Sequence, residues 1–159
     1  MRPGVRRASF VLALLLIAGS AFAQEFRNTT WLMSKDQVLA SESTHEISET
    51  NLGNHQQQVV FKSYVNGFAV TITYLLQNDE LLSASYTFRR DMDRTAFVAM
   101  EQDIQSKNGA PAFERDDLIG WRLARTEIAL AHLKDGTTYV AYWEKTYFAR
   151  LNNLTGAGR

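Results

Sequence analysis

The sequence predicts an α+β domain built from two successive helix-plus-three-strand units, about residues 31–90 and 91–151, with both helices on one face of an antiparallel sheet. Three observations predict this fold. Residues 59–88 alternate between apolar and polar side chains in three runs joined by tight turns. A helix-like segment precedes this stretch and another follows it. A second set of alternating runs fills residues 119–144.

The beginning of the chain predicts a secretory signal peptide over residues 1–23. Three arginines precede an apolar run at residues 10–18, and Ala21 and Ala23 suit cleavage before Gln24. The run is shorter than the roughly 20 residues of a membrane-spanning helix, and no cysteine follows it as a lipid attachment site. We therefore expect a periplasmic or secreted protein with no membrane anchor after cleavage.

The mature chain, residues 24–159, is expected to form a single domain with its own core. Removing the three leader arginines reduces the 17 basic residues to 14 against 17 acidic ones, a net charge of −3. Such a chain has no basic surface of the kind that binds nucleic acid or anionic lipid. It contains no cysteine, so its stability is expected to come from packing without disulfides.

The first turns determine which side chains share a face. Asn66-Gly67 predicts a type I′ hairpin that pairs Tyr64 with Ala69. An odd loop of three or five residues is expected near Asn78, because a one-residue shift would move every side chain to the wrong face. The buried face is then expected to hold Phe61, Val70, Ile72, Tyr74, Ala84, Tyr86 and Phe88. The open face is expected to hold Lys62, Tyr64, Thr71, Thr73, Ser83, Ser85, Thr87 and Arg89.

The segment before these strands carries a helix start. Ser34 and the glutamine three residues later form a capping box for a short helix over about residues 35–42. The polar stretch 41–58 has weak periodicity, and both a loop and an irregular helix are compatible with it. It contains His45 and His55, whose ten-residue separation does not suit a metal site, and no metal or other cofactor is expected.

A second helix is expected after the first set of strands. Asp91 or Asp93 is a candidate N-cap, and the helix should end near Lys107, where Asn-Gly-Ala-Pro at 108–111 stops it.

The last set of strands is predicted from its turns in the same way. Asp135-Gly136 predicts a two-residue hairpin that pairs Leu130 with Ala141, and a turn at Ala124-Arg125 sets Trp121 opposite Ile128. One face is then expected to contain Trp121, Leu123, Ile128, Leu130, His132, Tyr139, Ala141 and Trp143. The other face is expected to contain Arg122, Glu127, Ala129, Ala131, Val140, Tyr142 and Glu144.

Short motifs in the chain resemble small exported bacterial proteins. Trp-Leu-Met-Ser at 31–34 with Val38, the Asn-Gly-Ala-Pro stop at 108–111, and residues 121–130 resemble proteins of the β-lactamase-inhibitor-like and SmpA/OmlA-like outer-membrane-assembly lipoprotein type. Leu32 replaces a glycine of that pattern, and the lipid-attachment cysteine is missing. The resemblance implies a fold that presents a sheet surface or a helix edge to another protein.

The expected function is a non-catalytic protein-binding module that uses the open sheet face. Tyrosine and arginine often dominate protein interfaces, although such a face can also be simply solvated. Candidate partner-binding residues are Lys62, Tyr64, Thr71, Thr73, Arg89, Arg122, Tyr142 and Glu144.

Two other functions remain open from the sequence alone. One is a small-molecule or lipid carrier with an aromatic pocket between helices and sheet, lined by Trp121, Trp143 and Tyr139. The other is an enzyme of unrecognised type, which the sequence disfavours because it has no nucleophile elbow, phosphate-binding loop, zinc motif or cysteine. No catalytic residue is therefore assigned.

Overall fold

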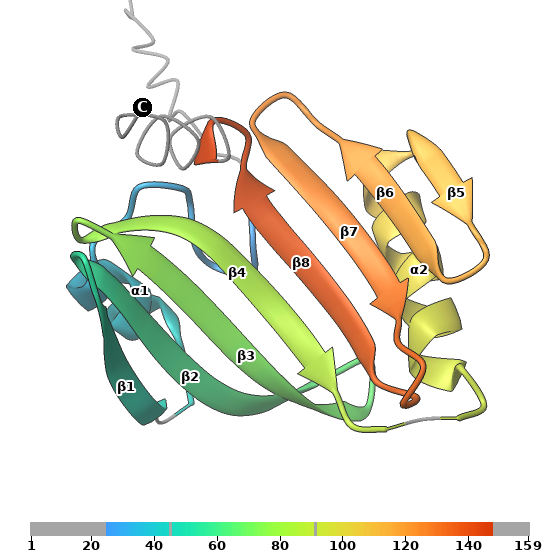
Figure 1. Ribbon diagram of the computed structural model, residues 1–159, viewed down its shortest axis with the longest axis horizontal. Helices are drawn as coiled ribbons and strands as arrows, with labels where there is room; N and C mark the ends of the chain where they lie inside the picture. The colour runs from blue at the N-terminus through green and yellow to red at the C-terminus, as the bar shows by residue number, and fades with distance from the viewer. Residues whose placement is uncertain (1–24, 45, 91, 148–159) are drawn as a thin grey trace, which may run out of the picture.

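The protein is dominated by one antiparallel sheet, seen in a computed structural model that describes residues 25–44, 46–90 and 92–147 (Figure 1). The strand order is β1-β2-β3-β4-β8-β7-β6-β5, so β4 pairs with β8 at the centre. The strands are β1 (Glu46–Gly53), β2 (Gln56–Val65), β3 (Phe68–Gln77), β4 (Glu80–Phe88), β5 (Phe113–Arg115), β6 (Leu118–Arg122), β7 (Thr126–His132) and β8 (Thr138–Glu144). The helices are α1 (Lys35–Ser41) and α2 (Thr95–Asn108).

The predicted division into two helix-plus-three-strand units is wrong. The fold is a single eight-stranded sheet with only two short helices, and the strands that the prediction lacks are β1 and β5. Both lie at the outer edges of the sheet (Figure 1). The described side chains of β1 are exposed, as are all three of β5. An edge strand without a buried face lacks the alternation by which the other strands were recognised.

The turns of the first half place the side chains on the expected faces. Asn66 and Gly67 have φ values of 50° and 82°, as a type I′ turn requires, and Tyr64 pairs with Ala69. The next turn is tighter than predicted, with only Asn78 and Asp79 between the paired strand ends. A bulge supplies the odd residue, because Leu75 pairs with Ser83 whereas Leu76 pairs with Leu81. Ile72 therefore still lies opposite Tyr86 and Val70 opposite Phe88.

The predicted register of the last hairpin is wrong by one residue. His132 pairs with Thr138 and Leu130 with Val140, not with Ala141. Gly136 has a φ of 86°, whereas Asp135 is not among the residues with positive φ, so these two residues do not form a type I′ turn. The Leu133 N–H donates to the Thr137 carbonyl at 2.8 Å, which leaves a three-residue loop with glycine at its last, left-handed position.

The two helices begin differently. The Ser34 hydroxyl accepts from the backbone N–H of Gln37, whose side chain accepts from the Ser34 N–H, which confirms the predicted capping box. The N-cap residue of α2 is Arg94, in a left-handed conformation and with no cap hydrogen bond from its own side chain, so the predicted N-cap position is wrong at Asp93; Asp91 lies outside the described residues. Gly109, with a φ of 80°, ends α2 as expected.

Both helices lie behind the sheet in Figure 1, α1 behind the first strands and α2 behind β6 and β7. One continuous core includes residues from both helices and from the central strands. The N-terminal segment crosses the junction of the two halves, where the Trp31 indole N–H donates to the Thr126 hydroxyl at 2.8 Å. The helices thus cover one face of the sheet and leave the other uncovered among the described residues.

Candidate functional site

The uncovered face of the sheet has short side chains along its middle. Adjacent strands align one cross-strand row on this face: Val60, Thr73, Ser85, Ala141, Ala129 and Gly120. A Cβ on Gly120 would come within 2.1 Å of the Phe113 ring, so Phe113 of β5 lies directly over this glycine. Larger polar and aromatic side chains lie on either side of the row. We call this surface the open face.

Five of the eight candidate partner-binding residues lie in strands at their predicted position on the open face: Lys62, Tyr64, Thr71, Thr73 and Arg122. Arg89 directly follows β4 and lies beside Lys62, Tyr64 and Thr71. Among the residues that the structure describes, Tyr64 is the most exposed large hydrophobic one, with 75% of its surface accessible. Lys62, Tyr64, Thr71 and Arg89 line one hollow of about 310 Å³, which we call the Lys62 hollow. Arg122 lies on β6, toward the opposite end of the sheet from this hollow.

Tyr142 and Glu144 do not lie on the open face, and their predicted placement there is wrong. The one-residue register shift of β8 turns both toward the helix side. Tyr142 packs against Phe26 with a ring separation of 5.0 Å. Glu144 is only 9% exposed and accepts hydrogen bonds from the Thr146 backbone and hydroxyl. Neither is available to a partner that docks on the open face.

The same shift brings two aromatic residues onto the open face that sequence reasoning assigned to the core. Tyr139 is 36% exposed and aligns with Thr87, Thr71 and Lys62 across the strands. The Trp143 indole N–H donates to Glu127 at 3.3 Å. Predicting a three-residue loop with Gly136 in the left-handed conformation would have placed both residues on the open face.

The predicted aromatic pocket does not form from the three residues named for it. Trp121 is buried at 2% exposure, and its indole N–H donates to the Gly109 carbonyl. Trp143 and Tyr139 lie on the opposite face of the sheet. These three side chains therefore cannot line a common cavity.

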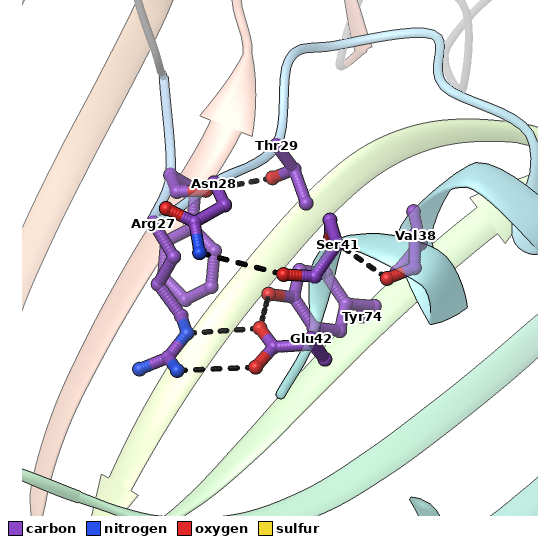
Figure 2. Close-up of polar contacts among 8 residues, drawn as sticks. Arg27, Asn28, Thr29, Val38, Ser41, Glu42 and Tyr74 are labelled. Atoms are coloured by element: carbon purple, nitrogen blue, oxygen red, sulfur yellow. Dashed lines mark hydrogen bonds and ion pairs between the residues drawn. The ribbon is translucent and has the colours of Figure 1, made fainter. Parts of the chain in front are cut away.

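A polar cluster on the helix side joins the N-terminal segment to the end of α1 (Figure 2). The Arg27 guanidinium donates to both carboxylate oxygens of Glu42, at 2.8 and 3.0 Å, and the Tyr74 hydroxyl donates to one of them. The Glu42 side chain is only 1% exposed. We call these three residues the Glu42 clasp.

The charges of Arg27 and Glu42 affect the pKa values of Tyr74, within the clasp, and of Tyr86, next to it. Burial raises the pKa of the Tyr74 hydroxyl above its usual value of 10.0, and the hydrogen bond to Glu42 raises it further. Burial also raises the pKa of Tyr86 to about 12, while nearby Arg27 opposes that rise. The clasp residues come from separate elements and contact through tertiary structure, so no local sequence pattern marks them.

The described residues contain no cluster of three or more histidine, cysteine, aspartate or glutamate side chains suited to a metal ion. His55 lies in the exposed β1–β2 turn, His132 contacts the Thr138 hydroxyl at 3.2 Å, and His45 lies outside the described residues. Neither described helix has the length and hydrophobicity of a membrane-spanning segment.

Comparisons with models of protein families, with characterised proteins and with solved structures find no match for this chain.

Proposed function

We propose that the protein is an exported, non-catalytic protein-binding module and that its open face docks on an acidic segment of a partner protein. The observation that carries this proposal is the Lys62 hollow. Lys62 and Arg89 flank it, and neither forms an ion pair with a carboxylate of the described residues. Two uncompensated cations beside an exposed tyrosine favour a partner that supplies carboxylates.

The composition of the surrounding surface supports the same proposal. Tyr64 lines the hollow together with both cations, and Tyr139 lies opposite Thr87, two residues before Arg89. Aromatic and arginine side chains are enriched among the residues that contribute most to interface affinity. The short side chains along the middle row allow a partner to approach the sheet backbone closely.

Export is proposed from the sequence of residues 1–23, which lie outside the described residues. The same proposal includes a free periplasmic or secreted location, with no membrane anchor and no nucleic-acid partner. Intact-mass measurement of the protein released from cells tests it, with a mature chain beginning at Gln24 expected. A chain that keeps its first 23 residues would contradict export by cleavage. The resemblance to β-lactamase-inhibitor-like and SmpA/OmlA-like proteins is likewise a proposal.

The binding experiment uses an extract of exported proteins from the source cells. The tagged protein should capture a partner, whose purified form should then bind with an affinity that falls with added salt. Lys62→Glu should weaken this binding about tenfold or more, because it places a negative charge where the partner is acidic. Lys134→Glu makes the same charge change in the exposed β7–β8 loop and should leave the affinity within about twofold.

Two further variants separate binding from folding. Tyr64→Ala should reduce binding while the melting temperature stays unchanged, because the side chain is mostly in solvent. Equal binding by wild type, Lys62→Glu and Tyr64→Ala would overturn the proposal, as would failure to capture any partner.

A further inference from the structure

A second cavity lies on the helix side of the sheet, opposite the open face. Its volume is about 620 Å³, within the range of small-molecule sites. The N-terminal segment at Glu25–Arg27, helix α2, and strands β4, β7 and β8 contribute to its lining. We call it the α2 cavity.

Three aromatic rings form one part of its lining. Phe26 lies 4.7 Å from the Tyr86 ring and 5.0 Å from the Tyr142 ring, and the two tyrosine rings are 6.1 Å apart. Met100 and Ile104 of α2 also belong to the lining, but each is only 1% exposed. Phe26 and Tyr86 are 3% and 7% exposed, so Tyr142 is the most accessible of the three rings. Such a lining favours a ligand with a flat or compact apolar body.

The charged side chains around the cavity are already paired within the protein. Arg27 is held by Glu42 at 2.8 Å, Arg125 by Glu25 at 3.1 Å, and Lys107 by Asp103 at 2.8 Å. A charged ligand would have to compete with these internal partners, and a neutral ligand would not. This competition is strongest at Arg27, whose Glu42 partner has a side chain only 1% exposed, and weaker at Lys107 and Arg125, which are 66% and 56% exposed.

One polar group in the lining has no protein partner. The structure gives the Tyr142 hydroxyl no hydrogen bond among the described residues, and it is not one of the fully buried polar atoms. It is therefore accessible from the cavity. Burial raises the pKa of this hydroxyl, so that it keeps its proton at neutral pH and remains a hydrogen-bond donor.

We propose that the α2 cavity binds a compact, uncharged molecule with an aromatic body and an oxygen that accepts a hydrogen bond from Tyr142. Neutral aromatic ketones, esters and ethers have this chemistry. The site lies on the face opposite the Lys62 hollow and does not depend on a protein partner there. Failure of one proposal therefore leaves the other standing.

The test uses Prodan, a neutral fluorescent naphthyl ketone whose emission shifts to the blue in apolar surroundings. The wild-type protein should bind it saturably with a blue shift. Neutral acetonaphthone should displace it, whereas naphthoate and naphthylmethylammonium at equal concentration should not. Displacement by either charged competitor as effective as that by acetonaphthone would overturn the proposed ligand class.

Two variants and one control variant test whether the probe binds in the cavity. Tyr142→Phe removes only the hydroxyl and should raise the Kd for Prodan about fivefold, the usual effect of one neutral hydrogen bond. Tyr139→Phe makes the same change three residues earlier on the opposite face and should leave the Kd unchanged. Ala124→Trp, at an exposed position of the cavity rim, should block entry and abolish saturable binding without disturbing the core.

The outcomes are decisive in either direction. The site is supported if saturable Prodan binding is lost in Ala124→Trp, is weaker in Tyr142→Phe, and is unchanged in Tyr139→Phe. No saturable binding by the wild type, or equal binding by all three variants, overturns it.

Discussion

In the first half of the sheet a seven-residue helix is held mainly by polar contacts at its ends, whereas in the second half a fourteen-residue helix is held by buried apolar side chains. Helix α1 buries only Val38, but it has a capping box, and Glu42 just beyond it forms the clasp with Arg27 and Tyr74. The N-cap residue of α2, Arg94, makes no side-chain cap hydrogen bond, and the helix buries four apolar residues. A short helix exposes too little apolar surface to dock by packing alone, so its end contacts determine its position.

The largest expected effect is on the packing of α2. Phe97→Ala should lower the free energy of unfolding by about 4 kcal/mol, because it removes a ring that is 3% exposed and leaves a cavity. Urea unfolding followed by circular dichroism measures this. Val98→Ala changes the next residue, which is 44% exposed, and should cost less than about 0.5 kcal/mol. Similar losses for both variants would show that α2 is not held by its buried stripe.

The Glu42 clasp should come second. Glu42→Ala should cost about 3 kcal/mol, since it leaves the Arg27 charge and the Tyr74 hydroxyl without their partner. Glu49→Ala is the matched control in the same half: its carboxylate pairs with Lys35 but is 40% exposed, and the loss should be within about 0.5 kcal/mol. The same urea titration compares them. Equal losses would contradict the view that the clasp positions α1.

Alkaline pH should weaken both halves through their buried tyrosines. An unfolded tyrosine loses its proton near pH 10, whereas burial raises the pKa of Tyr86 to about 12 in the folded protein. Between these values the unfolded state binds fewer protons, so stability falls as pH rises. Tyr86 alone should account for a loss of about 2 kcal/mol between pH 10 and 12, and its contribution to stability should be fully present well below pH 10.

Urea titrations from pH 8 to 12 measure this loss, and Tyr86→Phe should make it smaller. Tyr74→Phe and Tyr142→Phe should reduce it further, because burial also raises the pKa of both hydroxyls. Comparing Tyr74→Phe with Tyr142→Phe shows whether the remaining loss of stability at high pH arises in the first or the second half of the sheet. An unchanged slope in all three variants would contradict the argument.

The smallest effect is expected at the helix caps. Ser34→Ala should lower the free energy of unfolding by about 1 kcal/mol, because it removes the hydroxyl that accepts from the Gln37 N–H. Ser106→Ala, an exposed serine in the last turn of α2, should change it by less than about 0.5 kcal/mol. The melting temperatures of the two variants provide the comparison, and a larger shift for Ser106→Ala would show that the cap has no special role.

Local sequence signals predicted the parts of the fold that local chemistry determines. The capping box at Ser34 and the Asn66-Gly67 turn each depend on neighbouring residues, and both are confirmed. Asp135-Gly136 was misread because the dipeptide suits both a two-residue turn and the end of a three-residue loop. That single ambiguity placed Tyr142 and Glu144 on the wrong face and hid Tyr139.

Features without a local signal could not be predicted. The edge strand β1 carries no apolar alternation, since its described side chains are exposed. The Glu42 clasp joins residues that are 15 and 32 positions apart. The α2 cavity requires the N-terminal segment to lie against strands from the end of the chain. Such arrangements follow from tertiary contacts, which a single sequence does not display.

The pairing of β4 with β8 determines the order in which the parts of the sheet can fold. Ser83 and Tyr142, which are hydrogen-bonded across this junction, are 59 positions apart, and Trp31 and Thr126 are 95 apart. Closing such long loops costs more entropy than forming the hairpins on either side, so the two meanders should form before they join. During synthesis β4 remains an unpaired edge until the last strand emerges, and in that interval it can accept β8 from a second chain, which would yield a swapped dimer.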